Sequence, residues 1–101
     1  MSKMFDDSDG TSFMFRKYPM IGEGGEYPET SGVYIMAKET APVYIGQSEN
    51  LKKWLVPGHK KLECAKKQGA DAIYILEAPK EELEKRVRDL IYNYEPFCNG
   101  E

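Results

Sequence analysis

The chain has 101 residues, enough for one domain with one hydrophobic core and too few for two such domains. Hydrophobic residues make up 41% of it and aromatic residues 12%, which excludes a chain that is disordered throughout, although 31% of the residues are charged. No apolar run approaches the roughly 18 residues that cross a bilayer, and no basic segment followed by an apolar one begins the chain. We therefore expect a soluble, cytoplasmic protein without a membrane partner.

Residues 1–30 show neither sustained alternation nor helical periodicity, and we interpret them as a leader that precedes a domain of residues 31–100. The first ten or so residues should be mobile. Phe13 to Ile21 is apolar enough to pack against the domain as a strand or an extended arm. The leader is thus expected to be partly mobile or packed as an extra arm.

Two short β-branched and aromatic runs follow, Gly32 to Met36 and Val43 to Ile45, separated by a polar stretch. This pattern predicts a β-hairpin. Ser48 is the expected N-cap of a helix over Glu49 to Leu55, which Pro57 then ends.

The second half predicts a helix over His59 to Gln68, closed by Gly69, and a strand within Asp71 to Ala78. Pro79 suits the first turn of a last helix, whose apolar residues recur on one face: Leu83, Val87, Leu90, Ile91 and Tyr94. The predicted fold is a small single α+β domain of order β-β-α-α-β-α. Its three-stranded, antiparallel-containing sheet is flanked by helices.

The net charge of −3 argues against a protein that coats nucleic acid indiscriminately, because such affinity comes mainly from cations at phosphates. The lysines are nevertheless concentrated in residues 52–67, against Glu63 alone: Lys52, Lys53, Lys60, Lys61, Lys66 and Lys67. This segment suits a surface that contacts phosphates, or else an ordinary solvated helix face.

Cys64 and Cys98 are the two cysteines of the chain. There is no Cys-x-x-Cys pair and a single histidine to join a metal site. We expect both cysteines to be reduced, and no metal site built on them.

Several short motifs occur in a telling order. Gly32-Val33-Tyr34 is followed about ten residues later by Tyr44-Ile45-Gly46, then by Gln47 to Lys53, and near the far end by Leu90-Ile91 and Pro96 to Asn99. Over about residues 31–100 this ordered set resembles the GIY-YIG nuclease domain. The predicted order of elements agrees with the fold of that family.

The resemblance implies a site with two tyrosines on neighbouring strands, an arginine on the first helix and a glutamate on the last helix that holds one divalent metal. Tyr34 and Tyr44 match the tyrosines. The arginine position falls on Trp54, which offers one neutral donor, and the glutamate position falls on Val87, which binds no metal. Phosphodiester hydrolysis needs charge stabilisation that neither replacement supplies.

Two further positions match the family less tightly. His59 lies where family members carry a histidine or tyrosine, and it is interpreted either as a pocket-lining residue or as a surface residue. Asn99 matches a family asparagine near the site, and its alternative role is to cap the turn after the last helix.

The leading hypothesis is a catalytically impaired GIY-YIG-fold protein that acts as a nucleic-acid or protein binding module. One alternative is an active metal-dependent endonuclease, and another is a protein interaction domain that keeps only the scaffold. No cofactor is expected, except Mg²⁺ if the enzyme is active. DNA or RNA would bind through residues 52–67, with these candidate contacts: Lys52, Lys53, His59, Lys60, Lys61 and Asn99.

Overall fold

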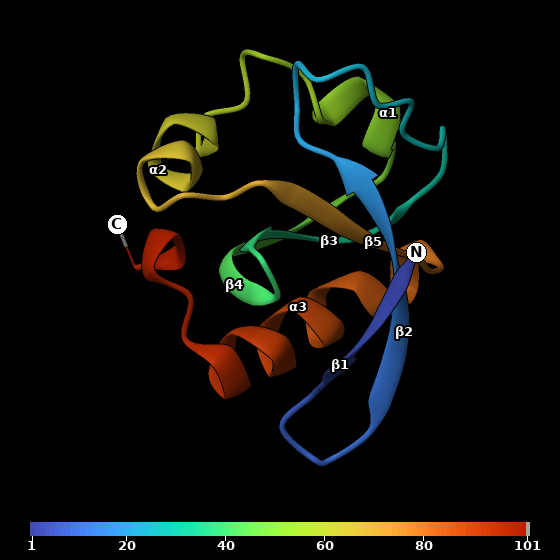
Figure 1. Cartoon of the computed structure of the whole chain (residues 1–101). Helices are drawn as coiled ribbons and strands as arrows, with labels where there is room; N and C mark the ends of the chain where they lie inside the picture. The colour runs from blue at the N-terminus through green and yellow to red at the C-terminus, as the bar shows by residue number, and fades with distance from the viewer. Residues whose placement is uncertain (101) are drawn as a thin grey trace.

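The computed structural model describes residues 1–100 and contains a five-stranded antiparallel sheet of order β1-β2-β5-β3-β4 (Figure 1). Its strands are β1 (Ser2–Asp6), β2 (Ser12–Pro19), β3 (Gly32–Lys38), β4 (Ala41–Ser48) and β5 (Ala72–Glu77). The α+β fold was predicted correctly, but the prediction of three strands was wrong. The two additional strands come from the segment interpreted as a leader.

The N-terminal hairpin explains the difference in strand number. The Asp7 carboxylate accepts hydrogen bonds from the backbone N–H groups of Asp9 and Thr11, at 3.1 and 3.0 Å, which closes the turn between β1 and β2. Phe5 and Phe15 are buried, with their ring centroids 5.2 Å apart. The first ten residues, expected to be mobile, therefore form strand β1 and its turn, and β2 pairs with β5.

Strand β3 lies between β4 and β5 and is buried on both faces. Its side chains alternate, so that Val33 and Ile35 belong to one apolar cluster while Tyr34 and Met36 belong to the other. The sheet thus separates two cores. Residues of α1 and α2 contribute to the core that holds Tyr34, and residues of α3 contribute to the other.

The helices are α1 (Leu51–Trp54), α2 (Leu62–Lys67), α3 (Lys80–Tyr94) and the short 3₁₀ helix η1 (Phe97–Asn99). Figure 1 shows α3 on one side of the sheet and α1 and α2 on the other. None of the helices in the described residues is long and apolar enough to span a membrane. Helix α3 follows the prediction, because its apolar stripe is regular over the whole helix.

The two short helices differ from the prediction at their starts. Asn50, rather than Ser48, caps α1, and its side chain accepts a hydrogen bond from the Lys53 N–H at 3.2 Å. Helix α2 begins at Leu62 rather than at His59, because the His59 ring turns inward and accepts a hydrogen bond from the Lys61 N–H at 3.0 Å.

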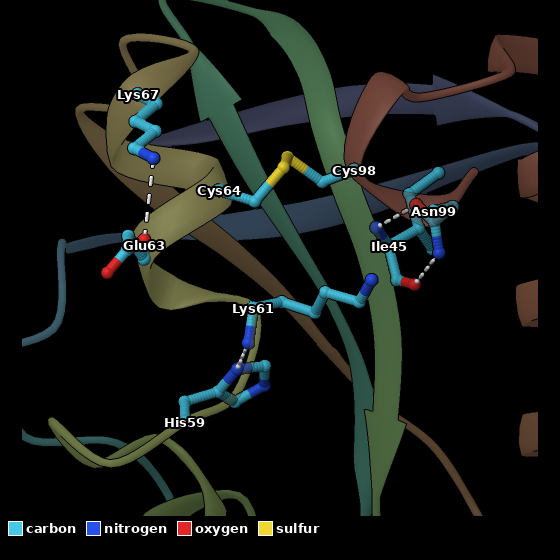
Figure 2. The surroundings of a disulfide bond; sticks show 8 residues. All are labelled: Ile45, His59, Lys61, Glu63, Cys64, Lys67, Cys98 and Asn99. Atoms are coloured by element: carbon cyan, nitrogen blue, oxygen red, sulfur yellow. Dashed lines mark hydrogen bonds and ion pairs between the residues drawn. A yellow bond between two sulfur atoms is a disulfide. The ribbon is translucent and has the colours of Figure 1, made fainter. Parts of the chain in front are cut away.

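Side chains near the C-terminus bind the backbone of two distant strands. The Asn99 amide accepts from the Ile45 N–H and donates to the Ile45 carbonyl, both at 2.8 Å (Figure 2). On β1, the Asp6 N–H donates to the Tyr94 hydroxyl and the Asp6 carbonyl accepts from the Asn93 side chain, both at 2.8 Å. Asn99 therefore binds a strand instead of capping the turn after α3.

A disulfide joins Cys64 on α2 to Cys98 on η1, with Cα atoms 5.9 Å apart (Figure 2). The prediction of two reduced cysteines was wrong. Nothing in the sequence brings these positions together, because the contact depends on how α2 and η1 pack beside β4. The bond ties the lysine-bearing segment to the end of the chain.

Reduction of this disulfide should lower the free energy of unfolding by roughly 2–4 kcal/mol, because the bond closes a loop of 34 residues in the unfolded chain. Urea unfolding with and without a thiol reductant measures the change. The double variant Cys64→Ala/Cys98→Ala should show a similar loss and no further response to reductant. An unfolding midpoint that does not move on reduction would contradict the bond.

Candidate functional site

Tyr34 and Tyr44 lie on the same face of the β3–β4 ladder. Tyr34 pairs with Gly46 and Tyr44 pairs with Met36, so the two rings are diagonal neighbours with centroids 6.0 Å apart. The two tyrosines therefore lie on neighbouring strands, as the family resemblance implies, and the register puts their side chains on one face. Tyr34 is, however, only 1% exposed, so its hydroxyl is enclosed by protein.

Gly46 provides the room for the Tyr34 ring. A Cβ atom placed on Gly46 would lie 2.6 Å from both the Cζ atom and the hydroxyl oxygen of Tyr34. This is closer than real Cβ contacts occur, and both atoms belong to a side chain packed in the core. The Tyr34 side chain thus requires a glycine as the last residue of the Tyr44-Ile45-Gly46 motif.

The Tyr34 hydroxyl is the centre of a hydrogen-bond network. The indole Nε1–H of Trp54 donates to it at 2.9 Å, and the Nε2 atom of His59 lies 2.6 Å from it. The Tyr44 ring packs beside this network, with its centroid 6.0 Å from that of Tyr34 and 5.8 Å from that of His59. The hydrogen bonds therefore join β3, the end of α1 and the loop before α2.

The tautomer of His59 follows from its second contact. The Lys61 backbone N–H donates to Nδ1 at 3.0 Å, so Nδ1 carries no proton in the neutral ring. The proton is then on Nε2, which donates to the Tyr34 hydroxyl. With Trp54 and His59 both donating, the Tyr34 oxygen has used its two acceptor positions.

Burial sets the charge state of this network. It raises the pKa of the Tyr34 hydroxyl well above its ordinary value, and the nearby Tyr44 raises it further, while the Trp54 hydrogen bond opposes the change. Burial also raises the pKa of Tyr44. The pKa of His59 is lowered by burial and then by the charge of Lys60. All three groups are therefore neutral at pH 7.

Trp54 stands where the family resemblance puts an arginine. Its N–H is engaged with Tyr34, and its ring meets the His59 ring edge-on at a centroid distance of 5.6 Å. An indole carries no positive charge and has no second donor for a phosphate. The side chain is nevertheless 46% exposed, beside the lysine-bearing segment.

Val87 stands where the resemblance puts the metal-binding glutamate. It is 9% exposed and packs with Ile45, Leu83 and Leu90, in the core on the opposite face of the sheet from Tyr34. Among residues 1–100 there is no group of three or more histidine, cysteine, aspartate or glutamate side chains that could hold a metal ion. Because a valine has no lone pair to offer, the residues present do not fit the expected divalent cation.

The remaining predicted site residues are placed as follows. His59 is buried within the tyrosine network, which matches the pocket-lining interpretation rather than the surface one. Lys52, Lys53 and Lys60 are exposed. Lys61 is only partly exposed, and Figure 2 shows its side chain extending toward the strand that carries Ile45.

The contacts among Trp54, His59 and Tyr34 could not be predicted from the sequence. Trp54 indicated that the family arginine is missing, but it did not indicate that the indole would donate a hydrogen bond to Tyr34. Only the backbone path between α1 and α2 brings the two rings to one hydroxyl.

Solved structures similar to this chain share its fold. One is the GIY-YIG N-terminal endonuclease domain of UvrC from Thermotoga maritima bound to its catalytic divalent cation, magnesium, with 28% identity, a TM-score of 0.61, and coverage of 71% of this chain and 85% of that one. A tyrosine-to-phenylalanine point mutant of the same domain gives 28% identity and a TM-score of 0.61, covering 71% and 84%. An asparagine-to-alanine mutant gives 28% and 0.60, covering 70% and 83%.

No protein-family model and no curated protein sequence matches the chain. The relationship is therefore carried by three-dimensional structure.

The lowered pKa of His59 predicts a pH dependence of stability. Its ordinary value is 6.5, and the folded value lies below this, so between the two values the unfolded chain binds more protons than the folded one. The free energy of unfolding should fall as the pH is lowered through this window and stay reduced below it. Urea unfolding at about pH 7.5 and about pH 5 measures the loss.

His59→Gln is the matched variant, because its amide can donate to Tyr34 but does not titrate. It should lose less stability than the wild-type protein over the same pH interval. Equal losses in the two proteins would show that His59 is not the titrating group.

Proposed function

We propose, from the GIY-YIG nuclease fold that this chain has, that the protein binds nucleic acid and does not cleave it. The observation that carries this proposal is the hydrogen bond from Trp54 to Tyr34, at the position where the family resemblance expects an arginine. A charged arginine, which could donate to a phosphate, is replaced by a neutral indole N–H that already donates to Tyr34.

Three features of the site support the absence of cleavage. The Tyr34 hydroxyl is buried and has no acceptor position left for a hydrogen bond from a water molecule. Its raised pKa keeps it from acting as a general base at neutral pH. Val87 offers no ligand for the magnesium ion that the UvrC domain binds.

Two features support binding to nucleic acid. The fold is that of a nuclease domain, and four exposed lysines gather on one part of the surface: Lys53, Lys60, Lys66 and Lys67. Lysines near each other gain affinity for phosphates by releasing condensed counterions, even when the whole protein carries a charge of −3.

The cytoplasmic location expected from the sequence is also a proposal. The Cys64–Cys98 disulfide weighs against it, because such bonds are rare in the cytosol. Alkylation of free thiols at the moment of cell lysis, followed by peptide mapping, decides whether the bond exists in the cell.

The purified protein should not cleave DNA or RNA in Mg²⁺. Loss of a phosphate-facing cation and of a metal ligand each removes several kcal/mol of transition-state stabilisation, and each 1.36 kcal/mol is about tenfold in rate. Incubation of labelled single-stranded and duplex substrates, followed by gel electrophoresis, measures this. Cleavage that disappears in Tyr34→Phe would overturn the proposal, because it would reveal a working site.

Binding should fall steeply as salt rises from about 50 to about 200 mM. Lys60→Glu/Lys66→Glu should weaken it and make its log–log salt dependence shallower by roughly 1.5 to 2. The matched control Lys17→Glu/Arg88→Glu changes the net charge equally at exposed positions on β2 and α3. Fluorescence anisotropy of labelled oligonucleotides measures all three proteins, and equal effects of the two double variants would place the binding surface elsewhere.

A further inference from the structure

Trp54 is an exposed aromatic side chain that is nevertheless held in place. It is 46% exposed, yet its Nε1–H is bound to the buried Tyr34 hydroxyl at 2.9 Å. The His59 ring meets it edge-on, with planes inclined at 74°. A ring fixed along one edge keeps its orientation. Stacking of a flat ligand on it therefore costs little further conformational entropy of the side chain.

Trp54 lines two of three neighbouring hollows in the surface. One, of about 370 Å³, is lined by Gln47 to Asn50 together with Lys53 and Trp54. A second, of about 290 Å³, shares Lys53 and Trp54 with the first and continues to Lys60. A third, of about 620 Å³, shares His59 and Lys60 with the second and ends at Lys67. Because neighbouring hollows share lining residues, we call the three together the track; Trp54 lines the first two.

The charge along this track is positive. Within residues 1–100, no acidic side chain pairs with Lys53, Lys60 or Lys66. The two acids at the track are each paired, Glu63 with Lys67 at 3.4 Å and Glu49 with Lys80 at 3.5 Å. The unpaired cations therefore line the hollows, Lys53 and Lys60 beside the exposed ring and Lys66 farther along.

We infer that Trp54 is a stacking platform for an unpaired base, and that the track holds a single-stranded nucleic acid whose phosphates contact Lys53, Lys60 and Lys66. This inference rests on the proposed binding function and names its substrate class. Every base has an aromatic face, whereas the bases of a duplex are already stacked on each other. The combination of a rigid ring with flanking cations fits a base and its neighbouring phosphates together.

The protein carries its own reporter for this contact, because Trp54 is its one tryptophan. Titration with an oligothymidylate of roughly a dozen nucleotides, a length that suits small single-strand-binding sites, should quench the tryptophan emission. A strand of the same length built from abasic sugars has the same phosphates and no bases. It should bind more weakly and leave the emission nearly unchanged.

Two variants separate the contribution of the aromatic ring to binding from that of the hydrogen bond to Tyr34. Trp54→Phe and Trp54→Leu both lose the donor to Tyr34, but only the first keeps an aromatic face. Trp54→Leu should bind oligothymidylate roughly 5- to 150-fold more weakly than the wild-type protein, and Trp54→Phe should lose much less. Tyr92→Leu, at an exposed aromatic on α3 away from the track, should bind as the wild type does. Circular dichroism of each variant checks that it is folded.

The outcomes separate this inference from the function on which it rests. If the abasic strand and oligothymidylate bind with equal, salt-sensitive affinity and neither quenches the tryptophan emission, the stacking platform is overturned. The proposed nucleic-acid binding then stays intact. Tighter binding to a duplex than to a single strand would overturn the stacking platform as well. Absence of binding to every strand at low salt would overturn both.

Discussion

The buried hydroxyl of Tyr34 is the group on which the arrangement of the site depends. It lies in a core, where a hydroxyl without hydrogen-bond partners would cost a few kcal/mol, and it obtains its partners from two separate parts of the chain, the end of α1 and the loop before α2. Because Trp54 and His59 both point at this one oxygen, the end of α1 and the loop before α2 are held at fixed positions above the sheet. Loss of any one partner leaves the others with an unsatisfied group.

Under the function proposed above, this network belongs to a nuclease scaffold that is used for something other than hydrolysis. A reacting group must be open to its substrate and must change its protonation state at the working pH. Tyr34 meets neither condition, since it is enclosed and its proton is held by burial and by its neighbours. The polar atoms of Tyr34, Trp54 and His59 form hydrogen bonds with one another. The exposed part of Trp54 is what the site presents to solvent.

Much of this fold could be predicted from local patterns, and the failures have physical causes. The apolar stripe of α3 and the β3–β4 hairpin were correct, because each is encoded within its own segment. Strand β1 was missed because Phe5 gains its burial from β2, Tyr74 and Tyr94, which are distant or unrecognisable in sequence. The Cys64–Cys98 bond depends on tertiary packing in the same way.

For the candidate site, too, local patterns predicted some features, and others depend on tertiary structure. The motif order placed Tyr34 and Tyr44 on neighbouring strands, whereas their shared face depends on the hairpin register, which only the structure supplies. The inward turn of His59 could not be deduced, because Pro57 and Gly58 permit several chain paths. The sequence signalled an absent arginine at Trp54, whereas the role of the indole emerged only from its distance to one oxygen.

The backbone contacts made by Asn99, Asn93 and Tyr94 have a consequence for the sheet as a whole. A strand at the border of a sheet offers free N–H and C=O groups to any extended peptide, and so invites aggregation. Ile45 on β4 and Asp6 on β1 lie on the two border strands, and at both places these groups are already taken by side chains from the C-terminal part of the chain. One short stretch of sequence thus occupies backbone groups at one place on each border strand, and an added strand could not form backbone hydrogen bonds there.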